Sequence, residues 1–108
     1  MRRPDHAASA TSGTRLGTVV MARLDVLAGL TDEPGLLTRL FLSPAHAAAA
    51  RQVGAWMEEA GMRVTIDAAG TVVGRYEGDR PGAPALLLGS HIDTVRDAQG
   101  RLWCPDPV

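Results

Sequence analysis

The chain has 108 residues, with 12 acidic and 11 basic side chains, a net charge of −1 and 45% hydrophobic residues. That length allows one small domain at most, and the hydrophobic fraction argues against a disordered chain. The near-zero charge removes the electrostatic case for a nucleic-acid partner or an anionic membrane surface. No apolar run in the sequence approaches the roughly 20 residues that a membrane span requires. The single cysteine, Cys104, cannot form an internal disulfide, which favours a cytoplasmic location.

The first 15 residues are small and polar and show no hydrophobic period, so we predict a disordered arm over residues 1–15. Its paired arginines are not followed by the apolar stretch of a secretion signal. Beyond the arm, apolar side chains recur at spacings of three and four, which predicts an amphipathic helix over residues 16–30. Pro34 and Gly35 then favour a turn, since proline cannot continue a helical hydrogen-bond ladder.

A second helix is predicted over residues 44–60. Ser43 is a favourable N-cap residue, and Pro44 suits the first helical position, where its missing N–H is not needed. Apolar residues recur at helical spacing along this stretch, and Gly61 is typical of the residue that follows a helix C-terminus.

The hydrophobic period then changes to two. Alternation over residues 62–67, a turn at 67–70 and a second run over 71–77 predict a hairpin of two strands. Residues 85–88 are a continuous apolar run closed by Gly89, which is typical of a strand covered on both faces. The order of these elements predicts an α/β fold, with two N-terminal helices followed by a partial mixed sheet.

His91 and Asp93 directly follow this predicted buried strand, at the place where ligands bind in open α/β sheets. Residues two apart in an extended segment point the same way, so the Asp93 carboxylate can approach the imidazole. A carboxylate that accepts one ring N–H leaves the other ring nitrogen free for a metal. From spacing alone, the alternative is a hydrogen-bonded histidine at a strand end that binds no ligand.

Three segments carry a resemblance to a known family: residues 37–44, 56–62 and above all 89–95. With them, the stretch from about Met21 to Val95 resembles the zinc-dependent amidohydrolases of the M20 peptidase superfamily. The most similar branch contains allantoate amidohydrolase, N-carbamoyl-L-amino-acid hydrolase and β-ureidopropionase. The resemblance implies that residues 16–95 form the N-terminal part of a zinc-peptidase-like catalytic domain, and that residues 96–108 are a divergent tail. One departure is Thr71, which stands where the family usually has Asn.

The resemblance also implies roles for two residues. His91 matches the first metal-ligand histidine of the family's two-metal site, and Asp93 matches the acidic residue that orients this histidine and supports catalysis. The family uses Zn²⁺ or Mn²⁺ to hydrolyse non-peptide C–N bonds in small ureido or amide substrates, such as allantoate or N-carbamoyl amino acids. The other metal ligands of the family are an Asp in a D-G-x-x-G segment, one Glu of a pair, and more distant histidines. The same Glu pair supplies the general base.

After Val95 the resemblance fades. Trp103 stands where the family has the bridging Asp, and Asp106 is displaced from that position, so neither is assigned a role. We therefore expect an inactive N-terminal fragment, ended by a frameshift or an early stop, that does not bind the metal tightly. The alternative is a non-catalytic α/β remnant or binding module without turnover. The family dimerises through a domain that this chain lacks, so the resemblance predicts no oligomeric state.

Three other residues have a structural and a functional interpretation. His46 is expected to be structural and not a ligand. Arg39 could reach a substrate carboxylate or form a salt bridge near the first helix, and the sequence leaves both open. Cys104 has no base beside it in the sequence, which argues against a nucleophile.

Overall fold

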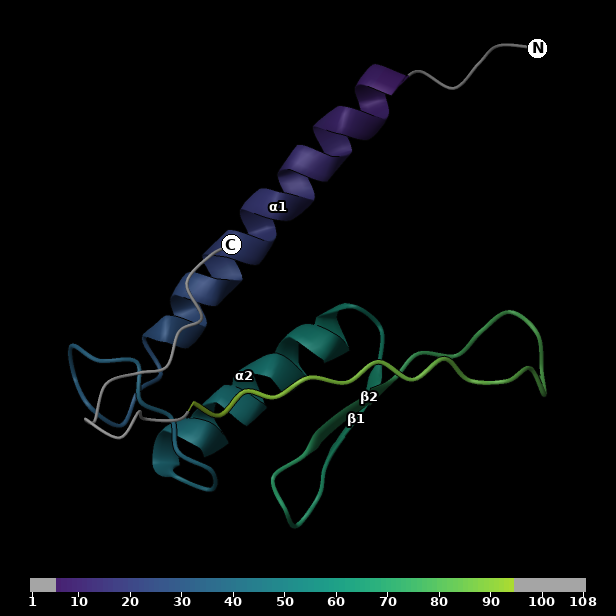
Figure 1. Cartoon of the computed structure of the whole chain (residues 1–108). Coiled ribbons are helices and arrows are strands. Elements are labelled where there is room, and N and C mark those ends of the chain that lie inside the picture. The colour runs from purple at the N-terminus through teal and green to yellow at the C-terminus, as the bar shows by residue number, and fades with distance from the viewer. Residues whose placement is uncertain (1–5, 95–108) are drawn as a thin grey trace, which may run out of the picture.

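The computed structural model describes residues 6–94. Their elements are two helices and one two-stranded antiparallel sheet: α1 (His6–Ala28), α2 (Pro44–Glu59), β1 (Arg63–Ile66) and β2 (Val72–Arg75). Figure 1 shows α1 projecting away as a rod, while α2 lies against the hairpin. The segment after β2 makes an excursion and returns along α2 without joining the sheet. Neither helix combines the length and hydropathy needed to span a bilayer.

Helix α1 begins at His6, whereas the sequence predicted a helix from Leu16. The prediction of a disordered arm is therefore wrong for residues 6–15, and residues 1–5 lie outside the described part. Alanine is the best helix former and is frequent in this stretch, so a helix nucleated further along can extend through it. The predicted apolar face of α1 has little cover: Leu16, Val20 and Leu24 are all more than half exposed.

Helix α2 is capped at both ends as predicted. Ser43 is the N-cap, its Oγ accepts from the His46 N–H at 3.1 Å, and proline occupies the first turn. The Asp32 carboxylate accepts a second free N–H of this turn, from Ala45, at 3.1 Å. At the other end, Gly61 has a φ of +88°, a conformation that glycine adopts without strain.

The predicted hairpin is confirmed, with β1 and β2 paired in the register Arg63↔Arg75 to Ile66↔Val72. Asp67 closes its turn, because its Oδ1 accepts the N–H groups of Ala69 and Thr71, each at 2.9 Å. Helix α2 packs on the hairpin, and the core among the described residues consists of small helix side chains: Ala45, Ala49 and Ala50. We call residues 44–75 the α2–hairpin unit.

The predicted strand over residues 85–88 is absent from the described structure. Leu86, Leu87 and Leu88 are 85%, 90% and 84% exposed, and no described residue pairs with them as a strand. A strand covered on both faces needs neighbouring strands and two covering layers, which the described residues do not provide. The prediction of an α/β fold is confirmed, but the sheet is antiparallel and not mixed. The predicted tail, residues 96–108, lies outside the described residues.

Candidate functional site

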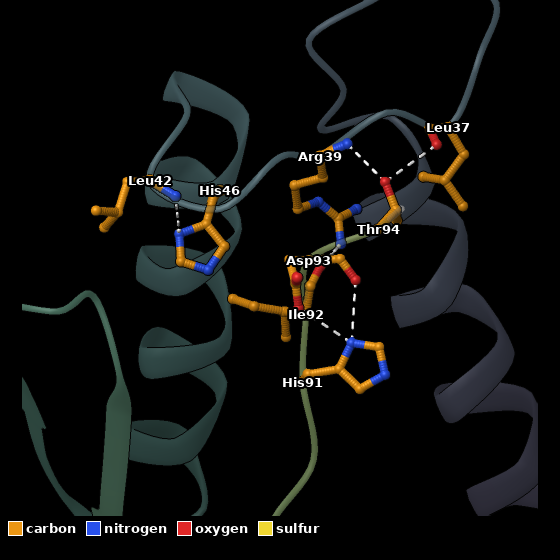
Figure 2. A network of polar contacts seen from close by, with 8 residues as sticks. All are labelled: Leu37, Arg39, Leu42, His46, His91, Ile92, Asp93 and Thr94. Carbon is orange, nitrogen blue, oxygen red and sulfur yellow. Dashed lines mark hydrogen bonds and ion pairs between the residues drawn. The ribbon is translucent and has the colours of Figure 1, made fainter. Parts of the chain in front are cut away.

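The His91 and Asp93 side chains face each other as their spacing predicted. His91 Nδ1 lies 3.1 Å from Asp93 Oδ1 and 3.1 Å from the Asp93 carbonyl oxygen (Figure 2). Both neighbours are acceptors when the carboxylate is ionised, so the ring carries its proton on Nδ1 and donates it to Asp93. The His91 side chain is 82% exposed, and its Nε2 keeps a free lone pair. The pair therefore has the form of a metal-ligating histidine oriented by a carboxylate.

The backbone beside this pair is fixed to the segment that precedes α2. The Thr94 N–H donates to the Arg39 carbonyl at 2.8 Å, and the Arg39 N–H donates to Thr94 Oγ1, also at 2.8 Å. The Thr94 hydroxyl in turn donates to the Leu37 carbonyl at 3.4 Å. Residue 94 is thus held by both its main chain and its side chain, although it lies 55 residues from Arg39 in the sequence.

The Arg39 guanidinium occupies a place that neither sequence interpretation anticipated. It is buried, and it donates to three backbone carbonyls: Leu30 from Nε at 3.0 Å, Ile92 from Nη1 at 2.8 Å, and Leu27 from Nη2. It makes no salt bridge with the described residues, and each of its three nitrogens donates to a backbone carbonyl. Burial lowers the pKa of Arg39, and the Asp32 carboxylate opposes this effect.

A largely apolar cavity of about 630 Å³ lies between the α2–hairpin unit and residues 87–93. Val53 and Met57 of α2 line one side, and His91 and Asp93 stand on the other. Open, mostly apolar hollows with a few polar groups are where small molecules bind. The candidate ligand His91 therefore stands at the wall of a space large enough for a small substrate.

His46 also borders this cavity, which the sequence did not predict. Its side chain is buried, and its ring meets that of Phe41 edge-on at 5.5 Å between centroids. Its Nδ1 accepts the Leu42 N–H at 3.4 Å, so the ring proton resides on Nε2 (Figure 2). His46 therefore packs within the structure and holds the Leu42 main chain. Its place beside Gly70 in the hairpin turn depends on a tertiary contact that no local pattern encodes.

The described residues contain no cluster of three or more His, Cys, Asp or Glu side chains that could enclose a metal ion. A catalytic zinc has about three protein ligands, whereas the His91–Asp93 pair offers one imidazole nitrogen. The other residues weighed for this chemistry, Trp103, Cys104 and Asp106, lie outside the described residues.

No protein-family model matches the chain, and no solved structure matches it significantly. Curated sequences do match. Allantoate deiminase 2 of Glycine max is 49% identical over 78 residues, and allantoate deiminase of Arabidopsis thaliana is 44% identical over 78 residues. N-carbamoyl-L-amino-acid amidohydrolase of Pseudomonas sp. (strain NS671) is 45% identical over 69 residues.

These matches cover 72%, 72% and 64% of this chain, but only 16%, 15% and 16% of the respective relatives. The chain thus spans about a sixth of the length of the curated relatives it matches. Relatives with both names match, as the resemblance of residues 21–95 predicted. Over 64–72% of its residues, this chain is therefore homologous to amidohydrolases named allantoate deiminase and N-carbamoyl-L-amino-acid amidohydrolase.

Proposed function

We propose that this chain supplies the first ligand of the catalytic centre in a zinc-peptidase-like amidohydrolase, which hydrolyses a C–N bond of a ureido or amide compound. The observation that carries the proposal is the contact of His91 Nδ1 with Asp93 Oδ1, at 3.1 Å, beside an exposed ring and an open cavity. The names of the matched relatives supply the reaction class.

The residues present fit a divalent cation such as Zn²⁺ or Mn²⁺. Neutral imidazole is a good ligand for both, and a carboxylate on the opposite ring nitrogen fixes the tautomer and raises the basicity of the ligating nitrogen. When bound, the cation polarises the substrate carbonyl and activates water. Asp93 holds the Nδ1 proton, and His91 directs its Nε2 lone pair outward. Because one imidazole is fewer than the usual set of about three ligands, we expect this chain alone to bind the metal weakly.

The proposed substrate carries a ureido group. Allantoate and N-carbamoyl amino acids, the compounds in the names of the relatives, share this group and a carboxylate. The apolar lining of the cavity suits the carbon skeleton of a small molecule, and the His46 Nε2–H is a buried donor at its wall. Identity to the allantoate deiminases reaches 49%, which favours allantoate as the first compound to assay.

A chimeric enzyme tests this proposal. Residues 16–95 of this chain replace the corresponding residues of Glycine max allantoate deiminase 2, and release of ammonia or urea from allantoate and from an N-carbamoyl-L-amino acid is measured with Zn²⁺ or Mn²⁺. We expect turnover of at least one compound. His91→Ala should abolish it, and Asp93→Asn should reduce it by about 10- to 100-fold, the usual cost of losing a partner of a ligating histidine.

Asp79→Asn is the matched control for Asp93→Asn. It removes the same negative charge, but from an exposed loop outside the cavity. It should leave turnover unchanged. A folded chimera without turnover would contradict the proposal, as would a chimera whose turnover survives both substitutions in the pair. The chain by itself, with either metal and either compound, should release no ammonia or urea, and measurable release would show that it holds ligands beyond His91.

A further inference from the structure

Arg39 is a buried cation whose guanidinium meets only backbone carbonyls within the described residues. Burying a charged side chain is costly unless its donors are satisfied. Here each guanidinium nitrogen makes one such bond, and together the three bonds join two separate parts of the chain: the end of α1, and the segment that carries His91 and Asp93.

Two of the three bonds hold the end of α1. Leu27 lies in the last turn of the helix and Leu30 lies just beyond it. Both carbonyls are therefore at the C-terminal end of α1, where carbonyl groups lack the N–H donors of a following helical turn. The negative end of the helix dipole also favours a cation there. Arg39 is therefore anchored on the helix side in both position and orientation.

The third bond reaches the residue between the members of the candidate site. Nη1 of Arg39 donates to the Ile92 carbonyl at 2.8 Å, just before Asp93 in the chain. Just after Asp93, the Thr94 N–H and Oγ1 both bond to the Arg39 main chain. The backbone is thus fixed on both sides of Asp93, and Figure 2 shows its side chain directed at His91 from this anchored position.

His91 has no comparable support of its own. Its ring is largely exposed, and the hydrogen bonds of the ring within the described residues go to Asp93 alone. The direction of the imidazole, and the nitrogen on which it carries its proton, therefore depend on where Asp93 is held.

We propose that Arg39, together with Thr94, is a positioning residue for the candidate ligand: it fixes residues 92–94 so that Asp93 retains the Nδ1 proton of His91 and the lone pair of Nε2 stays available. The use of His91 as a metal ligand rests on the proposed function, whereas the positioning itself does not.

The test reads the tautomer of His91 in the full chain without metal or substrate. In ¹⁵N-labelled protein at about pH 8.5, where histidine is ordinarily neutral, long-range ¹H–¹⁵N spectra identify which ring nitrogen is protonated. We expect the Nδ1–H form to dominate. Arg39→Lys keeps the positive charge but loses the planar set of guanidinium N–H donors, and Thr94→Val loses the hydroxyl. In both variants, the Nε2–H form of His91 should become the majority. Exchange of the amide proton of residue 94 should accelerate by about tenfold, because its bond to the Arg39 carbonyl opens more often when a neighbouring hydrogen bond of residues 92–94 is lost.

Three checks separate positioning from a general effect on folding. Thr94→Ser keeps the hydroxyl and should retain the Nδ1–H form, and Arg51→Lys makes the same exchange on the exposed face of α2 and should change nothing. Amide signals of β1 and β2 should persist in every variant. A dominant Nδ1–H form in Arg39→Lys or Thr94→Val overturns the proposal, as does loss of the hairpin signals together with the tautomer change, which would make the role of Arg39 merely structural. If the tautomer responds as expected while His91→Ala leaves the chimera active, the proposed function fails and the positioning stands.

Discussion

The α2–hairpin unit and the extended segment of residues 84–94 both carry apolar side chains, yet they bury them very differently. In the unit, Ala49 is fully buried and Ala50 is 3% exposed, whereas Leu87 in the segment is 90% exposed. The unit closes its contacts through short connections, so that helix and hairpin meet at little cost in loop entropy. Among the described residues, no strand pairs with this segment. Availability of a partner, and not apolar content, decides which leucine or alanine is buried.

The segment also differs from one end to the other. At residues 86–88 it is exposed, but at residues 92–94 it is held by hydrogen bonds to Arg39. Hydrogen bonds can fix a backbone without burying large side chains, and each contributes about 1 kcal/mol net. The candidate site thus depends on polar anchoring, while the unit beside it depends on close packing.

The strongest test of the packed region is Ala49→Asp. The Ala49 side chain is fully buried in the unit. A carboxylate at this position would lose its hydration and gain no hydrogen bond or counter-charge in return. We expect the loss to exceed about 3 kcal/mol, enough to unfold a small marginal unit. Circular dichroism and amide exchange of β1 and β2 measure it. Ala47→Asp is the control, because Ala47 is exposed near the start of the same helix, where a negative charge is favourable. Similar behaviour of the two variants would contradict the packing described for α2.

Ser43→Ala should have the next largest effect. The substitution removes the N-cap acceptor of α2, whose Oγ lies 3.1 Å from the His46 nitrogen. Loss of such a cap costs about 1 kcal/mol in the free energy of unfolding, which urea denaturation of the helix signal measures. Ser90→Ala makes the same change in the exposed segment and should have no effect. Equal effects at the two positions would remove the contrast between the two regions.

Asp32 adds a smaller contribution that depends on pH. A hydrogen bond from the Ser43 hydroxyl lowers the pKa of Asp32 below 3.8. Partial burial raises this pKa, and hydrogen bonds from the Ala45 and Leu40 N–H groups lower it. The unfolded chain therefore takes up this proton at a higher pH than the folded chain, so the stability due to Asp32 is complete above about pH 3.8 and is lost as the pH falls through the lowered value. Asp32→Asn should flatten the dependence of unfolding free energy on pH in this acid range. Asp79→Asn is the charge-matched control, and an unchanged slope in Asp32→Asn would show that its carboxylate does not cap α2.

Local chemistry in the sequence predicted α2 and the hairpin. Ser43, Pro44 and Gly61 are cap residues whose preferences arise within one turn, and the alternation over residues 62–67 requires only an adjacent strand. The spacing of His91 and Asp93 also predicted their contact, because it arises within three residues of extended chain.

The remaining features could not be predicted in this way. Residues 85–88 have the composition of a buried strand, but burial requires partner strands that the described residues do not contain. The sequence contained no signal for the bonds from Arg39 to Leu27 and Ile92, which join residues 12 and 53 positions apart. An arginine beside a helix end is compatible with a carboxylate, a ligand or a carbonyl, and only the tertiary arrangement selects the carbonyls.

The smallest expected effect belongs to Leu87→Ser. Leu87 is 90% exposed, so replacing it removes little apolar area from a buried environment, and the free energy of unfolding should change by less than about 0.5 kcal/mol. Val64→Ser is the matched variant in the unit, because Val64 packs closely against Gly54 of α2. It should cost roughly 1–2 kcal/mol, since a half-buried apolar group that packs on α2 is replaced by a hydroxyl. Urea denaturation of both variants compares the two regions directly. A loss of 1 kcal/mol or more in Leu87→Ser, by the same measure, would show that this leucine is buried in solution, and the segment would then be held by packing as well as by Arg39.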